Sequence, residues 1–205
     1  MEIHIQGIIG AGKTTVLKKM SSKIEESGKK TGIIWEPIDK WQKNGILKLF
    51  GSNNKRWSFL FQLISLLDKT EETEEYEEMR RSCDVILRER SLASDQCFIN
   101  TLVHQGNMTR RQEENYYRIR KHFTKVEPDV VLYVKTGVKT CGSRIAARNR
   151  DGESKISSDY QTLLSNEHDN VFGDLDNTVL FDNSGDLTDK KIDKLISDVG
   201  ISIEV

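Results

Sequence analysis

Short apolar runs alternate with longer amphipathic stretches along the chain. The apolar runs are IHI at 3–5, TGIIWEP at 31–37, CDVILRER at 83–90, DVVLYVK at 129–135 and NTVLFD at 177–182. Each run is rich in β-branched residues and does not alternate with polar ones, which is typical of strands buried in a parallel sheet. The amphipathic stretches predict helices over 14–27, 56–69, 110–125 and 156–171. Because strands and helices alternate, we expect an α/β fold with a parallel sheet covered on both faces.

The chain is expected to form one domain over residues 1–205. Its 205 residues, 36% of them hydrophobic, can bury one core and are few for two. Neither of the two prolines, Pro37 and Pro128, begins a linker, and no repeat or low-complexity tract interrupts the pattern. The acidic run EETEEYEEMRR at 71–81 is interpreted as the solvated face of a helix.

Charge and cysteine content exclude several classes of protein. The formal net charge of -1 argues against a nucleic acid or an anionic membrane as the main partner. The three cysteines are widely spaced and odd in number, which favours free thiols inside the cell over a disulfide framework or a zinc site. The chain starts directly with the first predicted strand and has no apolar run of membrane-spanning length, so we expect a cytoplasmic protein.

A glycine-rich turn follows the first predicted strand. The sequence GIIGAGKT at 7–14 fits the pattern G-x-x-x-x-G-K-[ST], with Gly7, Gly12, Lys13 and Thr14 in the fixed positions. Its glycines let backbone N–H groups surround a phosphate, and the following helix adds the positive end of its dipole. Lys13 can reach the outer phosphates, and the Thr14 hydroxyl can bind Mg²⁺. The turn predicts nucleotide binding and leaves open a transferase, an NTPase or a switch.

Charged residues lie where the second and third predicted strands end. Ligands bind at the carboxyl ends of parallel strands, so Glu36 is placed to orient or deprotonate an attacking hydroxyl. Glu89 can complete a Mg²⁺ shell with Thr14, while Arg90 can hold Glu36 or a substrate oxygen, because an unpaired buried charge is costly. The alternatives are a surface glutamate before Pro37 and a structural salt bridge.

An arginine-rich segment, SRIAARNRDGE at 143–153, follows the fourth predicted strand. Arg144 and Arg148 are four residues apart and share one helical face, and Arg150 follows them. A mobile segment of this kind neutralises charge in phosphoryl transfer and excludes water. The alternative is an ordinary basic helix.

In this order and at these separations, the motifs resemble the deoxynucleoside kinase family. The matching elements are GIIGAGKTT, EPIDKW, RWSFLFQ, RERSLASD, RIAARNRDGE and LFDNSGDL, from residue 3 to about residue 187. The resemblance implies a P-loop kinase fold with a five-stranded parallel sheet, helices on both faces and an arginine-rich lid at about 141–155. It also implies 5′-phosphorylation of deoxynucleosides for nucleotide salvage, with ATP or another NTP as donor, Mg²⁺ as cofactor, and usually a homodimer.

The resemblance also assigns roles to residues. Glu36 would be the base near the 5′-hydroxyl, Thr14 and Glu89 would share Mg²⁺, and Glu153 would bind a sugar hydroxyl. The residues with catalytic roles would be Glu36, Arg90, Lys13, Arg148 and Arg150. The donor nucleotide would contact Gly7, Ile8, Ile9, Gly10, Ala11, Gly12, Lys13, Thr14, Thr15, Arg144 and Arg148. The nucleoside would contact Glu36, Trp41, Phe61, Gln62, Lys69, Arg90, Asp95, Ile99 and Glu153.

Two positions depart from the family pattern. The family often has a tyrosine for the 3′-hydroxyl shortly before RW, where this chain has Phe50 and Gly51, so that contact rests on Glu153. An aromatic residue that commonly faces the base is replaced by Ile99, which leaves a roomier pocket.

Base preference is predicted from Lys69 and Asp95. Gln62 and Lys69 are seven residues apart, two turns along one helix face, and can point into the same pocket. In the resemblance, Asp95 matches an aspartate of deoxycytidine and deoxyguanosine kinases, and Lys69 matches the arginine paired with it. A carboxylate there accepts a hydrogen bond from an exocyclic amine, which predicts deoxycytidine or a purine deoxynucleoside over thymidine. The alternative is a surface salt bridge unrelated to the base.

Two other functions are compatible with the glycine turn. A nucleoside monophosphate kinase, such as a thymidylate kinase, would need cationic groups for an acceptor phosphate, where this chain has ERS at 89–91. A nucleotide-dependent switch or ATPase would leave the carboxylate, the glutamine and the apolar pocket unexplained. We therefore predict a deoxynucleoside kinase without a nucleic-acid or membrane partner.

Overall fold

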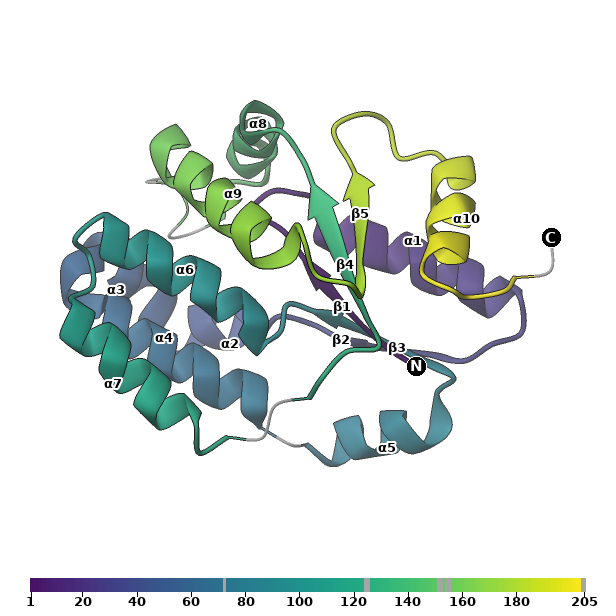
Figure 1. The fold of residues 1–205 in the computed structure, drawn as a ribbon, viewed down its shortest axis with the longest axis horizontal. Coiled ribbons are helices and arrows are strands. Elements are labelled where there is room, and N and C mark those ends of the chain that lie inside the picture. The colour runs from purple at the N-terminus through teal and green to yellow at the C-terminus, as the bar shows by residue number, and fades with distance from the viewer. Residues whose placement is uncertain (72, 124–125, 151–152, 154–155, 204–205) are drawn as a thin grey trace.

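The computed structural model describes residues 1–71, 73–123, 126–150, 153 and 156–203. At its centre is one sheet of five parallel strands in the order β2-β3-β1-β4-β5 (Figure 1). The strands are β1 (Glu2–Gln6), β2 (Thr31–Ile34), β3 (Val85–Glu89), β4 (Val130–Lys135) and β5 (Thr178–Asp182). Each strand coincides with one of the predicted apolar runs, so the predicted parallel sheet is confirmed.

Helices occupy the connections between the strands. They are α1 (Lys13–Glu26), α2 (Ile38–Lys43), α3 (Ile46–Ser52), α4 (Asn54–Thr70), α5 (Glu74–Ser82), α6 (Leu92–His104), α7 (Arg110–Arg120), α8 (Val138–Arg148), α9 (Ser158–Phe172) and α10 (Asp189–Asp198). The four helices predicted from amphipathic stretches correspond to α1, α4, α7 and α9, and the acidic run contributes to α5. Helix α7 ends at Arg120, earlier than predicted, and residues 124 and 125 of that prediction lie outside the described residues.

The helices cover both faces of the sheet, as predicted. Figure 1 shows α1 and α10 on one side and α6 and α9 on the other, with α4 and α7 packed beyond α6. The strand residues Ile5, Leu87 and Leu132 are fully buried and share one core with Leu17 of α1 and Leu164 of α9. This packing on both faces holds the carboxyl ends of the strands in fixed positions, and the predicted site residues follow those ends.

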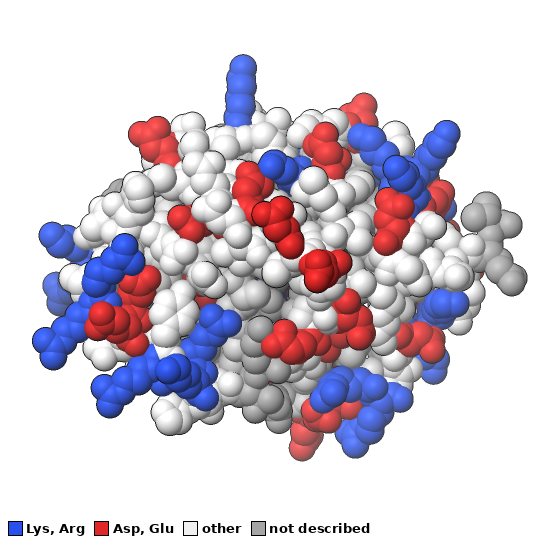
Figure 2. All heavy atoms as spheres, in the orientation of Figure 1, with Lys and Arg blue, Asp and Glu red and all other residues white. Residues whose placement is uncertain are grey.

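Charged side chains of both signs are scattered over the face drawn in Figure 2. On the face drawn in Figure 2, lysines and arginines are interspersed with aspartates and glutamates. The mixture agrees with the formal net charge of -1. Across the part of the chain that the structure describes, no helix combines the length and the apolar character needed to cross a membrane.

A histidine of α9 is buried in the core. His168 is fully buried, with its ring centroid 5.7 Å from that of Phe172 and 6.1 Å from that of Tyr133. Its Nδ1 donates a hydrogen bond to the Leu164 carbonyl at 2.8 Å. Burial, and less strongly the charge of Arg90, lowers the pKa of His168 from 6.5 to about 3. The folded protein therefore excludes a proton that the unfolded chain binds below pH 6.5.

Acidification is expected to destabilise the fold through His168. Because its folded-state pKa lies below the unfolded-state value, the free energy of unfolding falls as the pH drops from 6.5 towards 3, by up to about 1.4 kcal/mol per pH unit. In urea denaturation, the free energy of unfolding of His168→Phe should fall less steeply with decreasing pH than that of the wild type, by this amount per pH unit. The exposed His122 is the matched control, and His122→Phe should keep the wild-type slope. Equal slopes for all three proteins would show that His168 does not cause the pH dependence of the free energy of unfolding.

Candidate active site

A cavity of about 670 Å³ lies at the carboxyl ends of β1, β2 and β3. Most of the predicted site residues line it, namely Ile9, Gly10, Lys13, Thr14, Glu36, Trp41, Phe61, Gln62, Lys69, Glu89, Arg90, Arg148, Arg150 and Glu153. They come from the turn after β1, the end of β2, the helices α2 and α4, the end of β3 and the segment that includes the end of α8. Folding thus brings together side chains that are far apart in the sequence.

The glycine-rich turn between β1 and α1 is held in shape by its neighbours. The Ala11 carbonyl accepts hydrogen bonds from the Thr136 hydroxyl at 3.0 Å, the Asn183 amide at 2.8 Å and the Arg144 guanidinium at 3.1 Å. Gly12 has a φ of 91°, and a Cβ there would lie 2.5 Å from the amide nitrogen of Asn183, so glycine is required. Arg144, predicted to contact the donor nucleotide, here braces the turn and also donates to the Asn183 carbonyl at 3.1 Å.

Lys13 is buried at the start of α1 with little compensating charge. Its side chain donates to the Ile8 carbonyl at 3.2 Å. Burial, followed by the positive charge of Arg90, lowers the pKa of Lys13 from 10.5 to about 8. The carboxylates of Glu89 and Glu36 offset this lowering only in part, so an ammonium in this position is suited to bind an anionic phosphate.

Thr14 and Glu89 meet between α1 and β3. The Thr14 hydroxyl lies 3.1 and 3.2 Å from the two carboxylate oxygens of Glu89, to which it donates. Among the described residues, no group of three or more His, Cys, Asp or Glu side chains could hold a metal ion. Two protein oxygens fit a Mg²⁺ ion whose remaining ligands are phosphate oxygens and water.

Glu36 is paired with Arg90 at the edge of the sheet. The guanidinium of Arg90 donates to Glu36 at 3.2 Å and to the Gly7 carbonyl at 3.0 Å. Arg90 has a φ of 61°, which is rare for a residue with a side chain and tends to occur at functional sites. Burial alone would raise the pKa of Glu36, but Arg90, Lys69 and Lys13 outweigh it and hold the pKa below its ordinary value. Glu36 is therefore ionised at neutral pH and can accept a hydrogen bond.

Aromatic rings form one wall of the cavity. The rings of Trp41 and Phe61 meet edge to face with centroids 5.1 Å apart, and Phe50 stacks on Phe61 at 4.8 Å. The Trp41 indole nitrogen donates to Asp68 at 2.7 Å, which fixes the indole against α4. Phe50, where the family often has a tyrosine nearby, thus contributes an apolar ring to the wall and offers no hydroxyl.

Polar side chains of α4 line the cavity, among them Gln62, Ser65 and Lys69. Gln62 and Lys69 were predicted there, and Ser65 lies between them and also lines the cavity. Sequence reasoning missed Ser65, although the helical spacing that relates Gln62 to Lys69 passes through it. It also missed Phe98 of α6, whose ring centroid lies 4.7 Å from the guanidinium carbon of Arg90 and which lines the same cavity.

Ile99 and Asp95 of α6 lie away from the cavity wall. Ile99 is fully buried in a cluster that includes Leu102 and Tyr116, so Phe98, one position earlier, is the α6 residue on the cavity. One residue turns a helix by about 100°, which the sequence pattern alone did not resolve here. Asp95 is also fully buried, and its predicted pairing with Lys69 is confirmed at 2.5 Å. This placement does not support direct contact of Ile99 or Asp95 with a bound base.

The arginines after β4 are held by Glu153. Arg148 donates to both carboxylate oxygens of Glu153, at 2.7 and 2.6 Å, and Arg150 donates to one of them at 3.4 Å. All three residues line the cavity. Residues 151, 152, 154 and 155 of the predicted lid lie outside the described residues. In this arrangement, the carboxylate predicted to bind a sugar hydroxyl is occupied by arginine.

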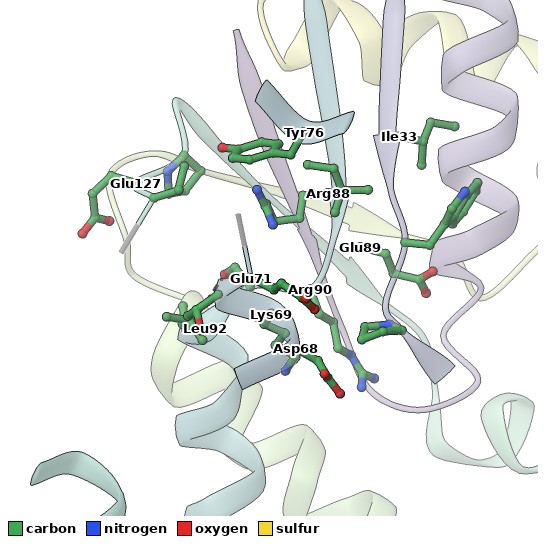
Figure 3. Close-up of a pocket in the computed structure, with 18 of the residues that line it drawn as sticks. Ile33, Asp68, Lys69, Glu71, Tyr76, Arg88, Glu89, Arg90, Leu92 and Glu127 are labelled. Atoms are coloured by element: carbon green, nitrogen blue, oxygen red, sulfur yellow. Dashed lines mark hydrogen bonds between the residues drawn. The ribbon is translucent and has the colours of Figure 1, made fainter. Parts of the chain in front are cut away.

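A second cavity of about 540 Å³ adjoins this site and shares lining residues with it. Figure 3 shows its labelled lining residues, with Arg88 beneath the ring of Tyr76. Lys69 and Arg90 line both cavities and so form part of the wall between them. The positive charges of Lys69 and Arg90 therefore act on both cavities.

Comparison with known proteins shows which family this chain belongs to. The family model described as "Deoxynucleoside kinase" matches residues 3–203. The mitochondrial deoxyguanosine kinase of Xenopus laevis is 25% identical over 206 residues, covering 88% of this chain and 76% of that protein. The deoxyguanosine kinase of Bacillus subtilis is 27% identical over 171 residues, covering 82% and 76%. Human mitochondrial thymidine kinase 2 is 26% identical over 180 residues, covering 82% and 62%.

Solved structures show the same fold. A deoxyadenosine kinase from M. mycoides with bound dCTP covers 97% of this chain and 98% of its own, with a TM-score of 0.80 and 22% sequence identity. The predicted P-loop kinase fold is thereby confirmed. Because the family model spans nearly the whole chain, this protein belongs to the deoxynucleoside kinase family and is a kinase.

Proposed function

We propose that this kinase transfers the γ-phosphate of ATP, or of another NTP, to the 5′-hydroxyl of a deoxynucleoside. One observation carries the proposal: the Glu36–Arg90 pair and the glycine-rich turn face the same cavity, which has an aromatic wall. The turn suits an anionic phosphate donor, and an ionised carboxylate suits a neutral hydroxyl acceptor. The aromatic wall suits a planar base.

Glu36 acts on the acceptor in this mechanism. Its carboxylate accepts a hydrogen bond from the 5′-hydroxyl and directs that oxygen towards the donor phosphate. The 3.2 Å contact with Arg90 keeps the carboxylate in place. Because the transition state of phosphoryl transfer is loose, orientation contributes more than early removal of the proton.

Three cations act on the donor. Lys13, Arg148 and Arg150 line the cavity and stabilise the negative charge that develops on the phosphate oxygens during transfer. Glu153 holds both arginines at the wall, and its carboxylate becomes available for a sugar hydroxyl if they turn to the donor. Thr14 and Glu89 would hold Mg²⁺, which supplies positive charge next to the outer phosphates when bound.

The Mg²⁺ requirement tests Thr14 and Glu89. We expect Thr14→Ala and Glu89→Gln each to raise the Mg²⁺ concentration for half-maximal rate by about tenfold, because each removes one oxygen ligand or its charge. A titration of the initial rate with MgCl₂ at saturating ATP measures this. Ser22→Ala, an exposed hydroxyl on the same helix, should titrate like the wild type. Unchanged titrations for both site variants would show that neither Thr14 nor Glu89 binds the Mg²⁺ ion.

The predicted alternatives differ from this proposal in the acceptor. A nucleoside monophosphate kinase would phosphorylate a nucleotide, and an ATPase or switch would release inorganic phosphate. Incubating the protein with γ-labelled ATP and one acceptor at a time separates the three. We expect the label in a deoxynucleoside monophosphate. Label only in a diphosphate or only in inorganic phosphate would favour one of the alternatives.

The base preference predicted from the sequence depends on Asp95. Relatives named for deoxyguanosine, deoxycytidine and thymidine are all similar to this chain and do not resolve the base. The predicted preference for deoxycytidine or deoxyadenosine over thymidine requires Asp95 to accept a hydrogen bond from the base amine. The Asp95 side chain is fully buried, which does not support that contact. We infer instead that selection rests on Gln62 and Lys69, which line the cavity.

We also infer a homodimer from the resemblance. Leu60 and Leu67 of α4 are 42% and 54% exposed, and Ile119 of the neighbouring α7 is 38% exposed, which offers an apolar surface for a second copy. The single domain over residues 1–205 and the cytoplasmic location stay predictions from the sequence.

A further inference from the structure

A glutamine of α9 holds one peptide group of the glycine-rich turn. The side-chain amide of Gln161 donates a hydrogen bond to the Ile9 carbonyl at 2.5 Å, across 152 residues of chain. Among the described residues, the Ile9 carbonyl accepts from no other donor. The Gln161 amide therefore fixes the direction in which this carbonyl points.

The other half of the Gln161 amide is unsatisfied. Gln161 is only 1% exposed, yet its Oε1 has no hydrogen-bond partner among the described residues. A buried acceptor without a partner costs free energy, which an apolar side chain of the same shape avoids. The amide is thus a poor choice for the stability of the core, and its N–H group is the part that forms a contact. A local cost of this kind is typical of functional positions.

The same peptide group is held at its other end by α8. Gly10 has a φ of 82°, and a Cβ there would lie 2.6 Å from the carbonyl oxygen of Cys141. Glycine is therefore required, because the Cα of Gly10 packs directly against the backbone of α8. With Gln161 on the carbonyl of Ile9 and α8 against Gly10, the peptide group between them has a defined orientation.

This orientation determines where the Gly10 N–H group points. The peptide bond is trans, so its N–H and its C=O point in opposite directions. Because the Ile9 carbonyl is turned towards α9, the Gly10 N–H is turned away from α9. Gly10 lines the 670 Å³ cavity, and its N–H donates to no group among the described residues. The turn therefore keeps this donor available for a ligand.

Resting on the proposed function, we propose that Gln161 is a positioning residue for the phosphate donor. By holding the Ile9 carbonyl on the α9 side, it keeps the Gly10 N–H directed at a phosphate of the bound nucleoside triphosphate. Phosphate oxygens accept hydrogen bonds from backbone N–H groups of such turns. Without the amide, the peptide group is free to rotate and its N–H is no longer pre-oriented, so the donor binds less tightly.

Gln161→Met tests this role, because methionine keeps the length of the side chain and loses the N–H donor. The probe is AMP-PNP, a non-hydrolysable analogue of ATP, with Mg²⁺. We expect its Kd in isothermal titration calorimetry to rise about tenfold, the scale of one hydrogen bond. The KM for ATP should rise likewise, with the KM for the deoxynucleoside within about twofold of the wild type. An unchanged Kd would overturn the inference.

Thermal unfolding separates a positioning role from a structural one. Because Oε1 of Gln161 is already unpaired, we expect Gln161→Met to melt close to the wild-type temperature. Asn166→Met is the matched control, since Asn166 is an exposed amide on the same helix, and it should keep the wild-type Kd and both KM values. A lower melting temperature in Gln161→Met, with equal rises in both KM values, would mean that Gln161 only supports the fold.

A second variant keeps the test decisive if Gln161→Met does not fold. Gln161→Asn keeps the amide but shortens the side chain by one methylene group, so the N–H no longer reaches the Ile9 carbonyl. We expect the same rise in the Kd of AMP-PNP, and a wild-type Kd would overturn the inference. The Kd is measured without phosphorylation. A wild-type protein that binds AMP-PNP but phosphorylates no deoxynucleoside would therefore contradict the proposed function instead.

Discussion

Glu36→Gln is expected to lower kcat roughly 10²–10⁴-fold with every deoxynucleoside, the range for losing a positioned general base. Glutamine keeps the length of the side chain and an oxygen that can accept from Arg90, which lies 3.2 Å away. It loses the negative charge that Arg90, Lys69 and Lys13 stabilise by holding the pKa of Glu36 below its ordinary value. The variant should therefore fold and bind nucleoside with KM changed far less than kcat.

A second carboxylate on the same cavity gives the control for Glu36. Asp39, in the first turn of α2, also lines the cavity and is exposed. Asp39→Asn removes the same charge and should leave kcat within about twofold of the wild type, as exposed surface changes usually do. Wild-type kcat in Glu36→Gln with every deoxynucleoside would show that Glu36 is not the group that acts on the hydroxyl.

Arg148→Ala is expected to lower kcat by roughly 10²–10³-fold while changing the KM for nucleoside little. Arg148 lies close enough to Lys13 to help lower its pKa, so both cations converge on the same part of the cavity. Their charge is needed most in the transition state, when the phosphate oxygens carry more exposed negative charge. Steady-state kinetics with ATP and nucleoside varied separately distinguish an effect on kcat from one on binding.

Two further variants define what Arg148 contributes. Arg148→Lys keeps the charge but loses the planar fork that binds both oxygens of Glu153 at 2.7 and 2.6 Å, so it should recover only part of the rate. Arg118→Ala, an exposed arginine on α7, should behave like the wild type. A raised KM for ATP with unchanged kcat in Arg148→Ala would mean that Arg148 serves ground-state binding only.

The sheet and the nucleotide-binding turn were predictable because local sequence determines them. Unalternating β-branched runs mark buried parallel strands, and GIIGAGKT contains both the glycines and the cation that a phosphate needs. The carboxyl ends of parallel strands meet at one edge, so the sequence alone predicts that Glu36 and Glu89 lie close together. Their neighbourhood in the structure bears out this reasoning.

The remaining features depend on contacts between distant segments. The Ala11 carbonyl is clamped by side chains 125 and 172 residues away, and no local pattern reports such contacts. The orientation of α6 decides that Phe98 and not Ile99 reaches the cavity, and it results from packing against α7 and α9. Asp95 is buried where its Oδ2 accepts a hydrogen bond from the Tyr116 hydroxyl of α7, a contact that no motif marked. These tertiary contacts change the expected base preference while leaving the expected reaction untouched.

A competition between a nucleoside and its monophosphate tests whether this kinase phosphorylates a free 5′-hydroxyl. Isotopically labelled deoxyguanosine and unlabelled dGMP, mixed in equal amounts with ATP and Mg²⁺, compete for the protein in one tube. Mass spectrometry and ³¹P NMR then identify each product. We expect labelled deoxyguanosine 5′-monophosphate and ADP, with no conversion of dGMP to dGDP. Accumulation of dGDP with the labelled nucleoside unchanged, or release of inorganic phosphate alone, would contradict it.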